Sequence, residues 1–289
     1  MPIDITKNNY ITAAGTGDTF DINIESLPAN FNNYFTETCR AAEEIYDHKQ
    51  GKLYLLYSGG MDSEYALSIF LSLGMSVTPV IIKLNPGYNA HDFKYATDFC
   101  SAKNLVPLII DIDLEDFVQS GKILDIAKSM KCNIYHRSTT AYAISQLGGT
   151  VILGDGDPYV KNNNGVWDVS IYEHDCAMVN YFKNNGIYGT PHFLYYTPEM
   201  LISFLTSQRI KELVNNQYPG KLGSNSSKHA VYNEHSNFNL VIRPKYHGFE
   251  LIEQQEIFKN PVFEEFDKLP WAGGFHEEYN TFIKRLCVQ

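Results

Sequence analysis

The sequence lacks any uninterrupted apolar run of about 18 residues, the length that a membrane-spanning helix requires. Its opening residues, MPIDITKNNY, also lack the basic start and apolar stretch of a secretory signal. These two absences argue against a membrane-spanning or secreted protein. We therefore expect a cytoplasmic protein with no membrane partner.

Cysteines are few and scattered. The chain has 5 of them, an odd number, and no two form a C-x-x-C pair; they are Cys39, Cys100, Cys132, Cys176 and Cys287. This spacing argues against a disulfide framework and against a structural zinc site. We expect buried or half-buried thiols without a catalytic role.

Basic residues are fewer than acidic ones, 23 against 33, so the formal net charge is −10. Proteins that bind a nucleic-acid backbone usually present a basic face. The charge balance therefore argues against a nucleic-acid partner and favours small-molecule chemistry. The phosphate-binding pattern G-x-x-x-x-G-K-[ST] is absent too, so a phosphate loop in this chain must be of another kind.

The chain has 289 residues, of which 44% are hydrophobic, enough for a large α/β domain with a real core. Short apolar runs predict buried strands at 53–57, 77–84, 105–112 and 150–153. Apolar spacing predicts a helix before the first strand, at 35–49, and further helices after the SGG loop, with apolar positions from Ala66 to Leu73 on one face and Gly74 at the end, and at 92–103. The segments 115–131 and 139–147 also look helical. Such alternation predicts a doubly wound parallel sheet, whose ligands bind at the carboxyl ends of the strands.

The alternation stops after residue 157. We predict an N-terminal extension at 1–34 with a turn at 15–18 between two short strands, an α/β core at 35–157, and a helical C-terminal lobe at 158–289. Within that lobe the sequence predicts a loop at 162–165, an amphipathic helix at 200–214 and a polar loop at 219–227.

Ser58-Gly59-Gly60-Met61-Asp62-Ser63 stands between the first predicted core strand and the helix after it. Glycines let an anion approach the backbone, and the N–H groups of a helix start point toward it. Ser58 and Ser63 can donate further hydrogen bonds. Asp62 would repel a bare phosphate, so we predict that it binds Mg²⁺; the plain alternative is an ordinary first-turn aspartate.

This loop resembles the S-G-G-x-D-S loop of the PP-loop ATP pyrophosphatases. Further segments, in the family's order, resemble asparagine synthetases over about residues 35–250: Arg137 with STTAY at 138–142, TVILGDGD at 150–157, PHFL at 191–194, KHAV at 228–231 and RPK at 243–245. The resemblance implies an adenine nucleotide α-hydrolase-like (HUP) fold. It also implies an enzyme that uses ATP and Mg²⁺, cleaves ATP between the α- and β-phosphates, and adenylates a carboxylate.

Roles for individual residues follow from the same resemblance. The residues expected to bind the nucleotide are Ser58, Gly59, Gly60, Asp62, Ser63, Leu84, Gly154 and Gly156. Those expected to act in catalysis are Lys228, Asp155, Arg243 and Lys245, with Lys228 neutralising charge on the phosphates; the plain alternative for Lys228 is a solvated loop lysine. Asp62 and Asp157 are the expected Mg²⁺ ligands. GDGD at 154–157 is one residue shorter than the family's G-E-G-S-D, so the roles of Asp155 and Asp157 could be exchanged. His174, His192 and His229 are weaker acid–base candidates.

The implied reaction joins a small carboxylate to ammonia or an amine, as in a C–N ligase that releases AMP and pyrophosphate. Pro2 stands where the family's glutaminase domain has its nucleophilic cysteine. We therefore expect free ammonia, another amine or a separate amidotransferase as the nitrogen source, and a homo-oligomer is a further possible partner. Two alternatives stay open: a nucleobase- or tRNA-modifying PP-loop enzyme, such as one resembling 7-cyano-7-deazaguanine synthase or a thiolation enzyme, and a non-enzymatic nucleotide-binding module.

Overall fold

The computed structural model describes residues 11–16, 19–24, 30–155, 159–171, 173–215, 224–244, 249–252, 254, 256–269 and 275–286. At its centre lies a five-stranded sheet in the order β5-β4-β3-β6-β9, in which all neighbouring strands are parallel. The strands are β3 (Lys52–Leu56), β4 (Thr78–Asn85), β5 (Leu108–Asp113), β6 (Gly149–Leu153) and β9 (Gly189–Thr190). Four of them were predicted from sequence, and β9 was not.

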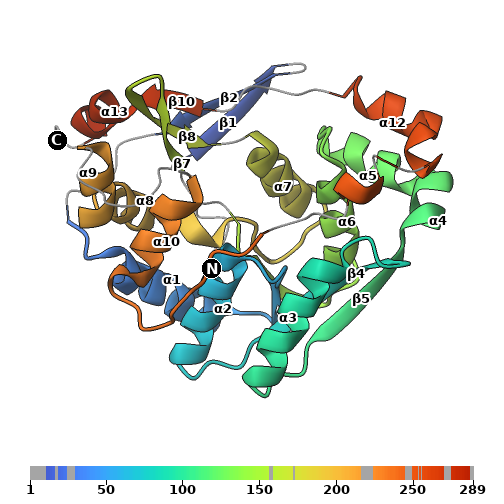
Figure 1. Cartoon of the computed structure of the whole chain (residues 1–289), viewed down its shortest axis with the longest axis horizontal. Coiled ribbons are helices and arrows are strands. Elements are labelled where there is room, and N and C mark those ends of the chain that lie inside the picture. The colour runs from blue at the N-terminus through green and yellow to red at the C-terminus, as the bar shows by residue number, and fades with distance from the viewer. Residues whose placement is uncertain are drawn as a thin grey trace.

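Both faces of the sheet are buried, as the apolar runs predict. Successive strand residues point to opposite faces. Leu55 is 0% exposed and packs with helices on one side, whereas Leu56 is 8% exposed and packs with helices on the other. The doubly wound α/β fold predicted from sequence is therefore confirmed (Figure 1).

Helices on the Leu55 side are α1 (Tyr34–His48), α2 (Met61–Ser72) and α3 (Ala90–Ala102). Those that pack on the other face or beside it are α4 (Leu114–Gln119), α5 (Lys122–Met130), α6 (Tyr135–Ile144) and α7 (Glu173–Asn184). The prediction of a single helix at 115–131 is wrong, because this segment forms two helices. Gly121 takes a left-handed backbone with φ of 75° and divides that segment into α4 and α5.

The segment after residue 158 is rich in helices, as predicted. They are α8 (Pro198–Leu205), α9 (Gln208–Val214), α10 (Ser224–Glu234), α11 (Phe249–Ile252), α12 (Pro261–Phe266) and α13 (Tyr279–Leu286), with short 3₁₀ turns at η2 (Phe193–Tyr195) and η3 (Glu256–Lys259). The helix predicted at 200–214 is interrupted, since the Ser207 hydroxyl accepts from the N–H of Ile210 and starts α9. Of the loop predicted at 219–227, residues 224–227 belong to α10, and the rest lies outside the described residues.

An antiparallel sheet in this segment was not predicted. It has the order β10-β8-β7 and comprises β7 (Tyr159–Asn163), β8 (Val166–Ile171) and β10 (Phe275–Glu278). The predicted loop at 162–165 is the turn between β7 and β8, with positive φ at Asn164 and Gly165, as tight hairpins require. Near the N-terminus, β1 (Ile11–Thr16) and β2 (Thr19–Ile24) form the predicted pair of short strands.

The first helix of the core and the C-terminal helices lie side by side. α1 contacts α8 and α10, and α10 also contacts α9, so these three C-terminal helices lie on the α1 side of the sheet, whereas α12 packs against α5 (Figure 1). Within the described ranges, every helix is too short or too polar to cross a membrane.

Candidate functional site

The loop between β3 and α2 lies at the carboxyl edge of the sheet, where the fold places its ligands. Gly59 has a φ of +75°, which a side chain would strain. A Cβ at Gly59 would also stand 2.8 Å from the carbonyl oxygen of Asp92 and 3.0 Å from the nitrogen of Ala96, both in α3. Glycine is thus required here by backbone conformation and by the close approach of α3.

Hydroxyl groups brace this loop. The Oγ atoms of Ser58 and Ser63 lie 3.2 Å apart, and the hydroxyl of Ser63 donates to the carbonyl of Gly60 at 3.1 Å. Helix α2 begins with Gly60 as its N-cap, so no side chain caps its first N–H groups. A helix start without a side-chain cap has N–H donors and partial positive charge to offer an anion. The geometry therefore fits a phosphate-binding loop.

Two residues of α10 bind the carboxylate of Asp62. The Nζ of Lys228 lies 3.1 Å from Oδ2 of Asp62, and the hydroxyl of Tyr232 donates to Oδ1 at 2.9 Å. Lys228 is 3% exposed, whereas the Asp62 side chain is 22% exposed. Lys228 is thus a buried helix residue that contacts the β3–α2 loop through Asp62, and the alternative of a solvated loop lysine is wrong.

Arg243 pairs with Glu64 on the same side of the loop. Its guanidinium donates to both carboxylate oxygens of Glu64 and to the carbonyl of Gly59, the latter at 3.1 Å. Tyr57 adds a hydrogen bond from its hydroxyl to Glu64 at 3.1 Å. Burial lowers the pKa of Arg243, but the bond to the Glu64 carboxylate outweighs it and leaves the pKa above its usual value. Arg243 therefore stabilises the β3–α2 loop through its bonds to the Gly59 carbonyl and to Glu64.

Burial, followed by the charge of Glu64, raises the pKa of the Tyr57 hydroxyl well above its usual range. Tyr57 therefore keeps its proton and remains a hydrogen-bond donor to Glu64. A donating Tyr57 and a charged Arg243 together satisfy a carboxylate that is only 5% exposed.

Asp155 follows β6, which pairs with β3 so that Leu153 lies opposite Leu56. A Cβ on Gly154 would stand 2.6 Å from the Cα of Ser63, so the end of β6 lies directly against the start of α2. Asp155 forms an ion pair with Arg137, a buried residue of α6. The loop is thus bordered by three pairs of opposite charge: Asp62 with Lys228, Glu64 with Arg243, and Asp155 with Arg137.

Leu84 lies in the core near the carboxyl end of β4, and 2% of its surface is exposed. Its N–H donates to the side chain of Asn89 at 2.8 Å, and its carbonyl accepts from Gly87 and Tyr88. Main-chain groups engaged in this way serve the turn into α3. None of these contacts supports the expectation that Leu84 binds the nucleotide, which stays a prediction.

Three predicted site residues, Gly156, Asp157 and Lys245, lie outside the described residues, as does the side chain of His174. His192 is buried with its ring stacked on Tyr195, and the Nε2 of His229 lies 2.8 Å from the carbonyl oxygen of Leu240. Neither contact places these two histidines at the loop.

The donor set fits a nucleotide phosphate better than it fits a free metal ion. Across the described ranges, no three His, Cys, Asp or Glu side chains gather into a metal-binding group. Each oxygen of Asp62 accepts one hydrogen bond and keeps a further lone pair. Asp62 can therefore contribute to a Mg²⁺ ion whose other ligands are phosphate oxygens and water.

Three residues of the site were missed from sequence, namely Tyr57, Glu64 and Tyr232, and two of them carry a signal that could have indicated them. Tyr232 lies four positions after Lys228, and this spacing on a helix puts both side chains on one face. Glu64 is an acidic residue in a helix otherwise apolar on most sides, and a buried carboxylate needs a partner. Both signals are present in the sequence, although neither identifies the partner.

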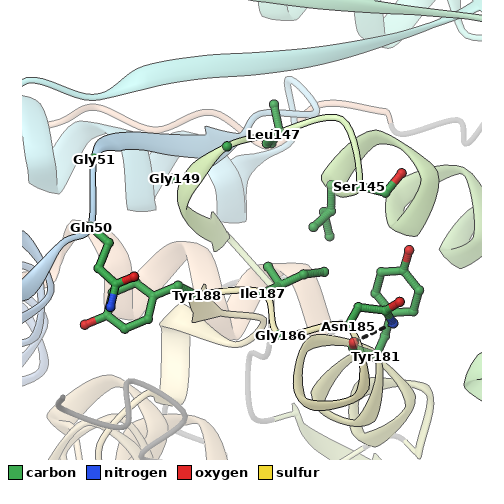
Figure 2. Close-up of a pocket in the computed structure, with 12 residues that line it drawn as sticks. Gln50, Gly51, Ser145, Leu147, Gly149, Tyr181, Asn185, Gly186, Ile187 and Tyr188 are labelled. Carbon is green, nitrogen blue, oxygen red and sulfur yellow. Dashed lines mark hydrogen bonds between the residues drawn. The ribbon is translucent and has the colours of Figure 1, made fainter.

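A separate cavity of about 610 Å³ lies at the opposite edge of the sheet (Figure 2). Gln50, Gly149 and Tyr188 line it near the amino ends of β3, β6 and β9. Its lining side chains are uncharged, so it offers no ion pair to an anionic ligand. The cavity is distinct from the loop site.

No protein-family model matches the chain, and no curated protein matches it either. Among solved structures, one similar chain is described as a predicted subunit of tRNA methyltransferase from Methanocaldococcus jannaschii. The two share 16% sequence identity with a TM-score of 0.32, over 65% of this chain and 91% of that chain. A likeness this loose carries no functional conclusion, so the chemistry of the site has to supply one.

Proposed function

We propose that this protein binds ATP at the β3–α2 loop and cleaves it between the α- and β-phosphates, transferring AMP to an acceptor. One observation carries the proposal: an S-G-G loop leads into a helix start without a side-chain cap, beside a buried lysine that is ion-paired to Asp62. The loop and helix start suit the β- and γ-phosphates that leave together as pyrophosphate. This pattern resembles the PP-loop ATP pyrophosphatases.

Each charged residue has a role in this proposal. Lys228 neutralises charge that develops on the phosphates as the α–β bond breaks. Asp62 would hold Mg²⁺, with Asp157 as a further candidate ligand, and the ion would supply charge neutralisation for the nucleotide when bound. Arg243 keeps the Gly59 carbonyl and the loop in place through Glu64. Asp155 and Arg137 border the site from β6 and α6, where the acceptor would approach.

For the acceptor, we propose a small carboxylate, activated as an acyl adenylate and then attacked by ammonia or an amine. The formal net charge of −10 supports a small-molecule substrate over a nucleic acid. A nucleobase or tRNA acceptor would use the same ATP chemistry and is the alternative. A separate amidotransferase could deliver the ammonia.

The products of ATP turnover test the first half of this proposal. Purified protein is incubated with ATP, Mg²⁺ and a panel of amino acids and other small acids, and the nucleotides are separated by chromatography. AMP and pyrophosphate in equal amounts are expected. ADP and orthophosphate as main products would refute the assignment.

The acceptor needs its own experiment. Pyrophosphate release is compared across small acids with ammonium salts, with glutamine, and with a total tRNA preparation. Stimulation by an acid together with ammonium supports the amide-forming reaction. Stimulation by tRNA alone, with incorporation of a new group into the RNA, would move the assignment to the alternative.

A further inference from the structure

The hydroxyl of Tyr232 and the ammonium of Lys228 reach the two oxygens of one carboxylate, that of Asp62. Both residues belong to α10 and are four positions apart, so their side chains project from the same face of that helix. Lys228 supplies charge, whereas Tyr232 supplies a neutral donor that can only orient its acceptor. The two contacts therefore differ in kind.

The ring of Tyr232 is held by a stack of tyrosines that we name the tyrosine stack: Tyr34, Tyr65 and Tyr232. Tyr232 and Tyr65 lie 4.3 Å apart, centroid to centroid, at an interplanar angle of 8°, and Tyr34 follows at 5.8 Å from Tyr65. All three are nearly or fully buried. The tyrosine stack thus joins α1, α2 and α10 at one point.

Tyr65 belongs to α2 and lies three residues after Asp62, so both side chains share one face of that helix. Tyr232 meets α2 twice on this face, through its ring at Tyr65 and through its hydroxyl at Asp62. A ring packed in this way has little freedom to move. The position of its hydroxyl is accordingly fixed relative to the Asp62 carboxylate.

We propose that Tyr232 is a positioning residue of the nucleotide site: it fixes Oδ1 of Asp62, so that this carboxylate keeps one orientation toward Lys228 and toward a Mg²⁺–nucleotide complex. The inference rests on the proposed function. It adds a residue outside the phosphate loop that acts on nucleotide binding only through Asp62.

The test uses Tyr232→Phe, which keeps the ring of the tyrosine stack and removes only the hydroxyl. Affinity is measured by calorimetry with a non-cleavable ATP analogue that has a methylene group between its α- and β-phosphates, in the presence of Mg²⁺. A hydrogen bond to a charged group contributes enough for roughly a tenfold loss of affinity. We expect Tyr232→Phe to raise the dissociation constant by about that factor.

Tyr279→Phe is the matched control, because it removes one buried tyrosine bond, 2.7 Å long, to the carbonyl of Leu205 on another helix pair. We expect it to leave the affinity unchanged within about twofold, while its loss of thermal stability is similar to that of Tyr232→Phe. Stability alone would then not account for the loss of binding in Tyr232→Phe.

A double-mutant cycle with Asp62→Asn separates positioning from a general structural effect. If Tyr232 acts through the Asp62 carboxylate, Tyr232→Phe weakens binding by less than about twofold once Asp62 is Asn. An equal loss in both backgrounds, or unchanged affinity of the single variant, would overturn the inference while the proposed function stands. Should Asp62→Asn itself bind the analogue like the unmodified protein, Asp62 would have no part in nucleotide binding and this inference would fall, whereas the proposed function fails only if the unmodified protein does not bind the analogue or releases ADP from ATP.

Discussion

The ammonium of Lys228 lies 3.1 Å from the carboxylate of Asp62, although 166 positions separate the two residues in sequence. One belongs to the first turn of α2, and the other to α10 in the C-terminal segment. A buried lysine is stable only beside an opposite charge or an acceptor. The pair therefore joins the β3–α2 loop to α10, and the candidate site depends on both.

Asp62→Asn removes the charge that Mg²⁺ requires while keeping the shape of the side chain. We expect pyrophosphate release to fall by at least about a hundredfold, the scale typical of a lost electrostatic stabiliser. The measurement is the initial rate of ATP-dependent pyrophosphate release, with circular dichroism as a check on folding.

Asp98→Asn is the control for this variant, since Asp98 is an exposed residue of α3 that pairs with Lys94 of the same helix. Its rate is expected to equal that of the unmodified protein. A folded Asp62→Asn protein that turns over at a near-normal rate would reduce Asp62 to a helix-start residue.

Arg243→Met leaves Glu64 buried without its main partner. Removing one member of a buried ion pair is strongly destabilising. Because the Arg243 side chain is 22% exposed, solvent lessens the effect, and we expect a loss of about 2 kcal/mol in the free energy of unfolding. Urea denaturation followed by circular dichroism measures it.

The exposed pair of Arg209 and Glu212 provides the comparison. Arg209→Met should cost less than about 0.5 kcal/mol, as exposed pairs on one helix usually do. Equal midpoints for the two variants would mean that Glu64 finds another partner and that Arg243 does not hold the loop.

Gly59→Ala is predicted to destabilise the protein more than Gly74→Ala. Both glycines have a positive φ, +75° and +69°, so both changes carry the strain of a left-handed residue, about 1 kcal/mol. Only at Gly59 would the new Cβ meet backbone atoms of α3, whereas nothing lies within 4 Å at Gly74. We expect a further loss of about 1–3 kcal/mol at Gly59.

Thermal and urea unfolding of the two alanine variants measure this difference. We also expect Gly59→Ala to lose nucleotide binding, because the loop must shift away from α3. If the two variants unfold at the same denaturant concentration, the loop accommodates a side chain and the close approach of α3 has no energetic consequence.

Burial raises the pKa of the Cys39 thiol to about 11, with the charge of Glu43 adding to the effect, and burial alone raises that of Cys100 to about 11. The thiolate is the reactive form. We expect iodoacetamide at pH 8 to label both cysteines much more slowly in the native protein than in urea, with mass spectrometry of the peptides as the readout. Labelling at equal rates in both states would contradict the burial of the thiols.

The same shifts predict how stability depends on pH. Between pH 9 and about 11 the folded thiols keep protons that the unfolded chain has released. The free energy of unfolding must therefore fall as pH rises through this window, and the stabilisation is fully present below pH 9. Urea midpoints measured between pH 8 and 10.5 test it, and Cys100→Ala should flatten the dependence.

The sequence by itself determined the central α/β unit. Apolar runs such as 53–57, bounded by glycines, favour buried strands, and the glycines of the loop allow the backbone conformation that the turn into α2 requires. These are local properties, because each depends on residues adjacent in the chain. For the same reason the glycine loop between β3 and α2 and its place at a strand end could be predicted.

Tertiary structure alone decided the partners. Lys228 could have been a solvated lysine, and the partners of Arg243 were open; the packing of α10 and of the segment after it placed the former on Asp62 and the latter on Glu64 and the Gly59 carbonyl. The sequence pattern around a charged residue does not indicate which distant residue of opposite charge will pair with it. The antiparallel β7–β8–β10 sheet was missed for a related reason, since β10 pairs with β8 across about a hundred intervening residues, and no local pattern indicates such a distant partner.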